Sequence, residues 1–303
     1  MTDNNVTLAQ VVLHKGEVVS EFYGPDVTAQ TTLISWSMAK SMTHALVGIA
    51  QMDGLLNVAD SHLFPEWEAD DRRNITVQQL LEMRSGLSWV EDYVDGDASD
   101  VIEMLFGSGK SDIASYAIAQ PPAAAPGVEW VYSSGTTNIV TRLLGNGLGD
   151  AKGSHVNIER FMRSRLFEAI GMQAQPKFDA AGTFVGSSYV FATARDFAKF
   201  GLLYLHDGVC NGVRILPEGW VDHARARHVF DEETGLGYGA HWWTLPGERN
   251  SLVAAGYEGQ YIMVIPDRDL VVVRLGKTVA ELRNTVVAEL RGVIEQFPVI
   301  GER

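Results

Sequence analysis

The amino-acid sequence predicts an α+β protein, in which both ends of the chain form one sheet and a long helical insertion lies between them. AQVVLHKGEVVSEFYG, near the start, is typical of two short strands around a Lys-Gly turn. SLVAAGYEGQYIMVIPDRDLVVVRLGK, near the end, predicts two more strands joined by a Pro-Asp-Arg-Asp turn. The chain between these segments carries helical patterns, which makes the sheet interrupted rather than continuous in sequence.

The helical insertion is predicted from apolar residues at helical spacing, broken by loops rich in Gly and Pro. Its segments are TVQQLLEMRSG, SDIASYAIAQPP, NIVTRLLGNGLGD, HVNIERFMRSRLFEAIG and ARDFAKFGLLYLHDG. A last helix, in TVAELRNTVVAELRGVIEQF, is expected to pack on the sheet. We therefore assign residues 1–36 and 235–303 to the sheet region and residues 37–234 to a mainly helical region.

Composition and charge exclude several classes of protein. The 303 residues are 46% hydrophobic and 20% charged, which is typical of a globular chain. The net charge of -14 disfavours nucleic acid and anionic membrane surfaces as partners. MTDNNVTLAQ lacks the basic start and apolar core of a signal peptide, and we expect a cytoplasmic location. The single cysteine, Cys210, has no partner for an internal disulfide.

SWSMAKSMTHALVGIAQMDGLL, residues 35–56, places a lysine in the opening turn of an apolar helix. The Asp53-Gly54 pair is a helix stop, because glycine accepts the left-handed conformation that ends helices. Residues three apart on a helix lie on one face, so Ser37 and Lys40 are neighbours. This spacing raises the question of whether the two form a catalytic pair.

A serine hydroxyl is a weak nucleophile and needs a base within hydrogen-bonding reach. Lys40 is a base only if its pKa falls, which burial among apolar neighbours and the positive helix N-terminus would bring about. Ser37 at that terminus also offers its backbone N–H to a developing oxyanion. The alternative is a capping serine followed by a lysine that extends to solvent.

Two further stretches favour the catalytic interpretation. In APGVEWVYSSGTTNIV, Tyr132 follows a Pro-Gly turn and could donate and accept a proton, although most tyrosines only pack and form one hydrogen bond. In AAGYEGQYIMVI, Gly256 and Gly259 interrupt a strand and indicate close approach of a ligand or backbone, or else a bulge. We expect Gly259 to leave room for substrate, with Tyr257 on the same strand face.

Three motifs in order resemble those of the penicillin-recognising serine hydrolases: Ser37-Met-Ala-Lys40, Tyr132-Ser133-Ser134 and Tyr257-Glu258-Gly259. ITVQQLLEMRSGL, SSYVFATARDFAKFGLLYL and GQYIMVIPDRDLVVV resemble the esterase and 6-aminohexanoate-dimer hydrolase branch of this superfamily. The resemblance covers nearly the whole chain. It implies the β-lactamase/DD-peptidase-like fold, a mostly antiparallel sheet flanked by helices beside a helical region, with the active site between them.

The resemblance also implies roles for individual residues. Ser37 is the expected nucleophile, Lys40 its general base and Tyr132 the relay that passes the proton to the leaving group. The backbone N–H groups of Ser37 and Gln260 form the expected oxyanion hole. The other expected substrate-binding positions are Gly259, Tyr257 and Ser134. The family needs no cofactor, and we expect no metal, because no histidine lies in a metal-binding motif.

Two departures from the family pattern bear on the substrate. Ser134 stands where asparagine is common, and Tyr257 where lysine or histidine is common. In members that recognise β-lactams this cation helps to hold a substrate carboxylate, so its absence favours small esters or amides. The alternatives are a β-lactamase or DD-peptidase, and a sensor or scaffold that is acylated without turnover. No segment matches the glutamate loop of class A enzymes, so deacylation is assigned to Lys40 and Tyr132.

Other residues near the motifs carry weaker expectations. Several tryptophans could wall an acyl pocket, with core packing as the alternative for each: Trp36, Trp89, Trp130, Trp242 and Trp243. The acidic run EDYVDGDASD, residues 91–100, could attract an amine, but a solvated loop is the preferred interpretation. His44, one turn beyond Lys40, could tune the lysine, although most helix histidines have no such role.

Overall fold

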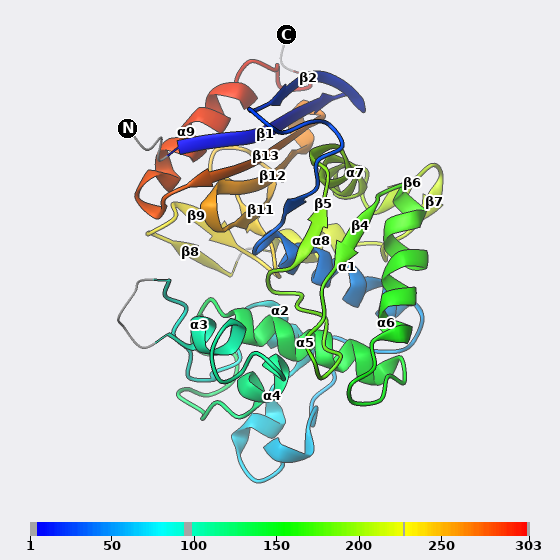
Figure 1. Cartoon of the computed structure of the whole chain (residues 1–303), viewed down its shortest axis with the longest axis vertical. Helices are drawn as coiled ribbons and strands as arrows, with labels where there is room; N and C mark the ends of the chain where they lie inside the picture. Colours follow the sequence, from blue (N-terminus) through cyan, green and yellow to red (C-terminus); the bar gives the residue numbers. More distant parts are fainter. Residues whose placement is uncertain (1–4, 94–98, 227, 302–303) are drawn as a thin grey trace.

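The main feature of the computed structural model, which describes residues 5–93, 99–226 and 228–301, is an eight-stranded antiparallel sheet (Figure 1). Its strand order is β2-β1-β13-β12-β11-β10-β9-β8. The strands are β1 Asn5–His14, β2 Glu17–Tyr23, β8 Val229–Asp231, β9 Leu236–Tyr238, β10 Trp243–Thr244, β11 Leu252–Gly256, β12 Gln260–Ile265 and β13 Leu270–Thr278. β1 pairs with β13 along its length. Both chain ends therefore form one sheet, as the sequence predicts.

The C-terminal part of the sheet differs from the prediction in its number of strands, in the third motif and in where it begins. A short 3₁₀ turn, η5 (Tyr257–Gly259), separates β11 from β12, so this region has three strands instead of two. Glu258 has a φ of 60° and Gly259 a φ of 78°, which reverses the chain within the motif. The expectation that Tyr257 and Gly259 share a strand face is therefore wrong. The sheet also begins before residue 235, since β8 belongs to it.

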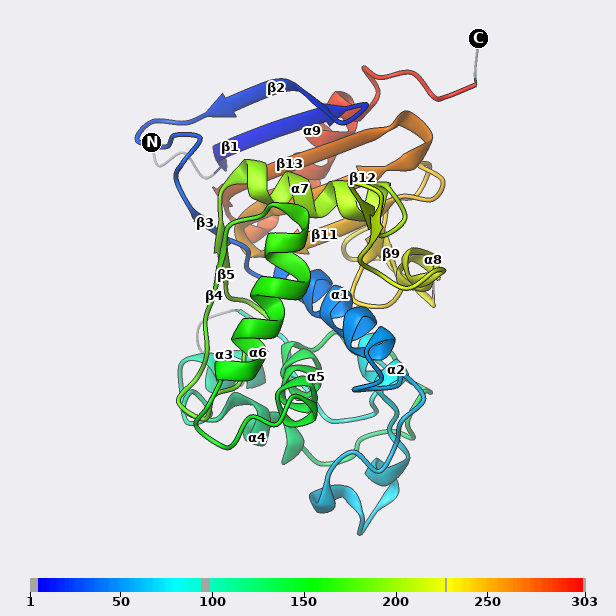
Figure 2. The same ribbon diagram turned by 90° about the vertical axis from the view of Figure 1, so that its right-hand side faces the viewer.

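Two helices cover opposite faces of the sheet, as Figure 2 shows. α7 (Ala194–Leu205) contacts the face that carries Val271 and Val273 of β13. α9 (Arg283–Ile294) packs with the alternate residue Val272 on the other face. Successive side chains of a strand point to opposite faces, so β13 is apolar along nearly its whole length. The predicted packing of the C-terminal helix on the sheet is confirmed.

The remaining helices form a region below the sheet in Figure 1. They are α1 Met38–Met52, α2 Val77–Leu81, α3 Asp100–Leu105, α4 Ile113–Ile118, α5 Ser134–Gly147, α6 Val156–Phe161 and α8 Trp220–Arg225. Short elements complete the region: β3 Leu33–Ile34, β4 Ala174–Pro176, β5 Val190–Ala192, β6 Val209–Cys210, β7 Val213–Arg214, η1 Pro65–Trp67, η2 Asp71–Asn74, η3 Met162–Phe167 and η4 Glu168–Ile170. The 3₁₀ turns η6 Pro266–Arg268 and η7 Ala280–Leu282 belong to the sheet part. Across the described ranges, no helix has both the length and the hydropathy needed to cross a membrane.

Helix α1 joins the two parts and carries the first motif. It contacts β11 and β12 on the sheet side and α5 on the helical side. Every residue from Met38 to Ala50 is buried, which explains why most of them are apolar. The helix ends at Met52, with Asp53 as its C-cap and Gly54 next at a φ of 70°, in agreement with the predicted Asp53-Gly54 stop.

Gly201 in α7 marks the closest approach of this helix to the sheet. A Cβ atom added there would lie 2.6 Å from Val271 Cγ1 and 3.0 Å from Ile262 Cγ2. We expect Gly201→Ala to lower the free energy of unfolding by about 1–3 kcal/mol, because overpacking forces the sheet to shift. Gly292→Ala in α9 is the matched control, since nothing lies within 4 Å of its added Cβ. Urea denaturation measures both; equal effects would contradict this packing.

Candidate active site

The nucleophile candidate Ser37 follows a residue in an unusual backbone conformation. Trp36 has a φ of 44°, which is uncommon for a bulky side chain. Its indole Nε1 donates a hydrogen bond to Glu258 Oε2 at 3.1 Å. Glu258 is itself left-handed. This bond therefore ties the start of α1 to the third motif and holds both turns in place.

Strand β11 approaches the nucleophile closely at Gly256. A Cβ atom added to Gly256 would lie 2.5 Å from the Ser35 carbonyl oxygen and 3.2 Å from the Ser37 backbone nitrogen. Only a residue without a side chain fits this contact. Gly256 also pairs with Gln260 in the sheet, so the first and third motifs meet here.

Lys40 is buried, with 2% of its surface exposed, and its amine has three acceptors. Nζ donates to Ser37 Oγ at 2.9 Å, to Ser134 Oγ at 2.9 Å and to the Ser187 carbonyl oxygen at 3.1 Å. Burial lowers the pKa of Lys40 to about 8, against a smaller opposing effect of Glu91. Ser37 makes no side-chain cap. The alternative of a capping serine and a solvent-directed lysine is therefore wrong.

Tyr132 lies beside this pair, with its ring centroid 4.8 Å from Lys40 Nζ. Burial raises the pKa of Tyr132, and the nearby Glu91 raises it further, while a hydrogen bond with Ser37 opposes both. The phenol therefore keeps its proton at neutral pH. Trp243 and Tyr238 pack against the ring at centroid distances of 5.5 and 5.9 Å and hold it in position.

Ser134 lies against the base, although the sequence assigned it to substrate binding. It is the first residue of α5 and is fully buried. Its hydroxyl accepts from Lys40 and donates to Glu91 Oε1 at 2.5 Å. Its backbone N–H donates to Glu91 Oε2 at 2.8 Å. Ser133 caps the helix through Thr136, which leaves the Ser134 hydroxyl free for these contacts.

Glu91 lies at the candidate site, and the sequence interpretation did not include it. The solvated-loop expectation is wrong for it, because its carboxylate accepts hydrogen bonds from Ser134, from Trp89 Nε1 at 2.6 Å and from Tyr93 OH at 3.2 Å. The sequence signal for this contact was the alternation Trp89-x-Glu91-x-Tyr93, because alternate residues of an extended segment lie on one side of it. Residues 94–98 of the acidic run lie outside the described residues.

The third motif contributes an aromatic side chain to the site. Tyr257 is 37% exposed, meets Trp36 edge to face at a centroid distance of 5.8 Å and stacks on Tyr93 at 5.0 Å. Gly259 also meets a structural requirement, and its expected role in leaving room for substrate stays a prediction. Its φ is 78°, and an added Cβ would lie 2.3 Å from Nη1 of Arg274.

The side chain of Gln260 is used within the sheet. Its Nε2 donates to the carbonyl oxygens of Tyr257 at 3.0 Å and Gly276 at 2.8 Å, and its Oε1 accepts from the Gly276 N–H at 3.0 Å. The assignment of the backbone N–H groups of Gln260 and Ser37 to the oxyanion hole is still a prediction. Their proximity across Gly256 supports this prediction.

The histidine and tryptophan candidates fall into two groups. The ring nitrogens of His44 bond Tyr204 OH at 2.8 Å and His223 Nδ1 at 3.0 Å, so its contacts lie away from Lys40. Trp242 is fully buried and stacks on Phe200 in the core. The other four tryptophans border the site. Trp36 contacts Tyr257, and Trp89 contacts Glu91. Trp130 and Trp243 both pack near the Tyr132 ring.

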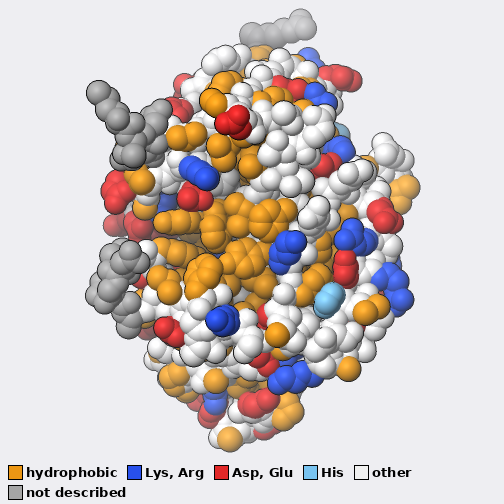
Figure 3. Space-filling view, viewed as in Figure 1, with side chains coloured by type: hydrophobic (Ala, Val, Ile, Leu, Met, Phe, Trp, Pro, Cys, Tyr) orange, Lys and Arg blue, Asp and Glu red, His pale blue; other side chains and the backbone are white. Residues whose placement is uncertain are grey.

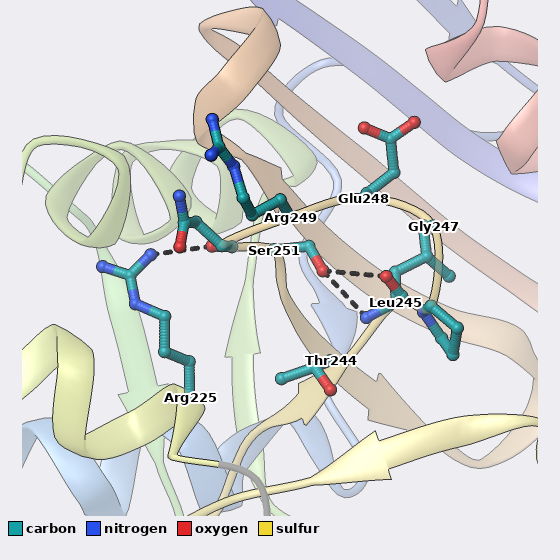
Figure 4. Close-up of a pocket in the computed structure, with 9 residues that line it drawn as sticks. Arg225, Thr244, Leu245, Gly247, Glu248, Arg249 and Ser251 are labelled. Atoms are coloured by element: carbon teal, nitrogen blue, oxygen red, sulfur yellow. Dashed lines mark hydrogen bonds between the residues drawn. The ribbon is translucent and has the colours of Figure 1, made fainter.

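Apolar side chains gather in a hollow in the middle of one face of the molecule, between the sheet and the helical region (Figure 3). A second hollow is lined by residues 244–251 and Arg225, with Arg225 Nη1 donating to the Asn250 carbonyl oxygen at 2.8 Å (Figure 4). Its lining shares no residue with the three motifs. In the described part of the chain, no cluster of three or more His, Cys, Asp or Glu side chains is placed to hold a metal ion.

The sequence matches the β-lactamase family over residues 3–291. The chain belongs to the β-lactamase family. It is 25% identical over 316 residues to the 6-aminohexanoate-dimer hydrolase of Paenarthrobacter ureafaciens, which covers 90% of this chain and 73% of that protein. The predicted family is therefore confirmed.

Solved structures with low sequence identity to this chain have the same fold. A Bacillus anthracis protein provisionally named 6-aminohexanoate-dimer hydrolase superposes with a TM-score of 0.81 at 21% identity, covering 98% of this chain and 81% of that one. A penicillin-binding protein of Bacillus halodurans gives 0.72 at 15% identity, covering 95% and 97%. The predicted β-lactamase/DD-peptidase-like fold is confirmed by these likenesses.

The pH dependence of Ser37 reactivity tests the role of Lys40 in this β-lactamase-family site. Lys40 must lose its proton before it accepts that of Ser37, so modification of Ser37 by a fluorophosphonate should accelerate with rising pH, with a midpoint near the lysine pKa of about 8. Lys40→Arg should abolish the acceleration, because a guanidinium stays protonated. Lys152→Arg, at an exposed ion pair with Asp112, is the control. An unchanged profile in Lys40→Arg would contradict base catalysis by Lys40.

Proposed function

We propose that this protein is a serine hydrolase that cleaves small esters or amides through an acyl-enzyme on Ser37. The observation that carries the proposal is the 2.9 Å hydrogen bond between Ser37 Oγ and the buried Lys40 amine, whose pKa is lowered to about 8. A lysine that titrates near neutral pH is suited to general-base work. The hydrolase name of its 25% identical relative supports the same reaction class.

The proposed reaction has two halves. Neutral Lys40 takes the proton of Ser37 while Oγ attacks the substrate carbonyl carbon, and the backbone N–H groups of Ser37 and Gln260 stabilise the oxyanion. Tyr132 gives its phenol proton to the leaving group and regains a proton from Lys40. In the second half water attacks the acyl carbon and the Lys40–Tyr132 pair accepts its proton. The bond between the acyl carbon and Ser37 Oγ then breaks, and the pair returns the proton to Ser37.

The surroundings of Ser37 favour neutral substrates. Tyr257, Trp36 and Tyr93 present aromatic surface beside the nucleophile, and the hollow in Figure 3 is mainly apolar. The carboxylates of Glu91 and Glu258 add negative charge near the site. Arg283, whose positive field reaches Tyr132, is paired with Glu233 at 3.3 Å. A carboxylate-bearing β-lactam would therefore bind less well than a neutral ester.

Ser37→Ala tests the nucleophile. We expect turnover of p-nitrophenyl acetate to fall by at least about a hundredfold and covalent labelling by a fluorophosphonate to disappear, because nucleophile loss in hydrolases costs as much as ~10⁶ in kcat. Ser164→Ala, an exposed serine whose Oγ bonds the Arg160 carbonyl oxygen, is the control. Wild-type product release must continue past one equivalent; a burst that stops there would instead identify an acylated sensor.

Tyr257→Lys tests the substrate class. A cation at this position should raise kcat/KM for nitrocefin by about tenfold, because a charge-assisted hydrogen bond is worth about 1.5–3 kcal/mol against roughly 1 for a neutral one. Hydrolysis of a neutral acetate ester should change much less. Tyr257→Phe separates loss of the hydroxyl from gain of the charge. A wild-type enzyme that hydrolyses nitrocefin as fast as the ester would overturn this assignment in favour of a β-lactamase.

A further inference from the structure

The three acceptors around the Lys40 amine differ in whether they can also donate. The ammonium form has three hydrogens, which match Ser37 Oγ, Ser134 Oγ and the Ser187 carbonyl oxygen. The neutral amine has two hydrogens and one lone pair. One partner must therefore become a donor to the lone pair. The Ser187 carbonyl is excluded because it has no hydrogen, which leaves the two serine hydroxyls in competition.

The Glu91 carboxylate decides this competition. Its Oε1 accepts from the Ser134 hydroxyl at 2.5 Å and from Tyr93 OH at 3.2 Å. Its Oε2 accepts from the Ser134 backbone N–H at 2.8 Å and from Trp89 Nε1 at 2.6 Å. A carboxylate only accepts, so the Ser134 hydrogen points at Glu91 and its oxygen lone pair at Lys40. Ser134 is fully buried, so water cannot replace this partner.

We propose that Glu91 is a positioning residue for Lys40: it locks the Ser134 hydroxyl as an acceptor and so reserves the lysine lone pair for the proton of Ser37. This role rests on the proposed hydrolase function. It also explains how serine serves at a position where the family commonly has asparagine. An asparagine can present a carbonyl oxygen, whereas a serine hydroxyl has a hydrogen that must be held away from the base.

Glu91→Gln should reverse the orientation of the Ser134 hydroxyl. The indole of Trp89 and the backbone N–H of Ser134 are donors only, so the amide oxygen of the glutamine must take the Oε2 position. Its NH₂ group then faces the two hydroxyls and donates to Ser134. The Ser134 hydrogen is left to point at the Lys40 lone pair, where it competes with Ser37.

The decisive measurement is the pKa of Lys40, followed by NMR of protein labelled with ¹³C at the lysine ε-carbon, with the resonance assigned by its loss in Lys40→Arg. Ser134→Ala should lower this pKa in the wild type, because it removes an acceptor from the ammonium. In the Glu91→Gln background the same substitution should raise it, because it removes a donor to the neutral amine. Each shift should be about half a pH unit or more, as expected for one hydrogen bond.

The other charged and titratable groups near Lys40 do not produce this reversal of sign. Tyr93, which also hydrogen-bonds Ser134, and Tyr132 stay protonated, because burial raises the pKa of both phenols. His241 stays neutral, because burial, with a smaller effect of Lys40, lowers its pKa to about 3. Loss of the Glu91 charge lowers the Lys40 pKa with either serine or alanine at position 134, so it does not by itself change the sign of the Ser134→Ala shift. A Ser134→Ala shift of the same sign in both backgrounds would therefore overturn the proposal.

Fluorophosphonate labelling of Ser37 supplies the kinetic test. On the high-pH plateau Glu91→Gln should slow labelling by about tenfold or more, and the double variant with Ser134→Ala should regain at least about threefold of this loss. Asp100→Asn is the matched control, because Asp100 also accepts from a backbone N–H and a tyrosine hydroxyl, those of Val90 and Tyr116. The proposal would be overturned if the plateau labelling rate were unchanged in Glu91→Gln. It would also be overturned if the rate losses of Glu91→Gln and Ser134→Ala simply added in the double variant.

The two measurements separate this proposal from the proposed function. A wild-type protein that resists labelling at Ser37 would contradict the hydrolase, while the Lys40 titration would still support or overturn the lock. Glu91→Ala, which also frees the Ser134 hydroxyl, replaces Glu91→Gln if the glutamine variant does not fold. It should give the same reversal of sign.

Discussion

The burial of one amine is the constraint on which the arrangement of this molecule depends. Lys40 lies in a helix whose neighbouring residues are all buried, and an unpaired cation there would be strongly destabilising. Its three acceptors come from the residue before α1, from the first residue of α5 and from the loop before β5. Satisfying a single nitrogen therefore fixes three distant segments against one another.

The same constraint extends to the sheet through the turn that precedes Ser37. The left-handed Trp36 and the left-handed Glu258 are joined by a hydrogen bond, and Gly256 lets β11 reach the start of α1. Strained residues persist only where their surroundings determine them. The sheet and the helical region thus meet at Ser37.

The pKa of Lys40 results from two opposing electrostatic effects. Desolvation disfavours the ammonium, whereas the negative charge of Glu91 favours it. Desolvation is the larger effect, so the pKa of the amine falls to about 8. The carboxylate acts without direct contact, through the Ser134 hydroxyl between them. A direct Lys–Glu ion pair would instead raise the lysine pKa and remove the base.

The spacing of residues along the sequence determined the local structure around Ser37 and the pairing of the chain ends. Because helical periodicity fixes which residues share a face, the sequence alone placed Ser37 beside Lys40, placed the end of α1 at the Asp53-Gly54 pair and paired the two chain ends through strand patterns. Tertiary structure decided the rest. Ser134 lies 94 residues from Lys40, Ser187 lies 147 residues away, and no periodic pattern encodes such contacts. Glu91 looked solvated because charge patterning carries no information about which buried donors will converge on a carboxylate.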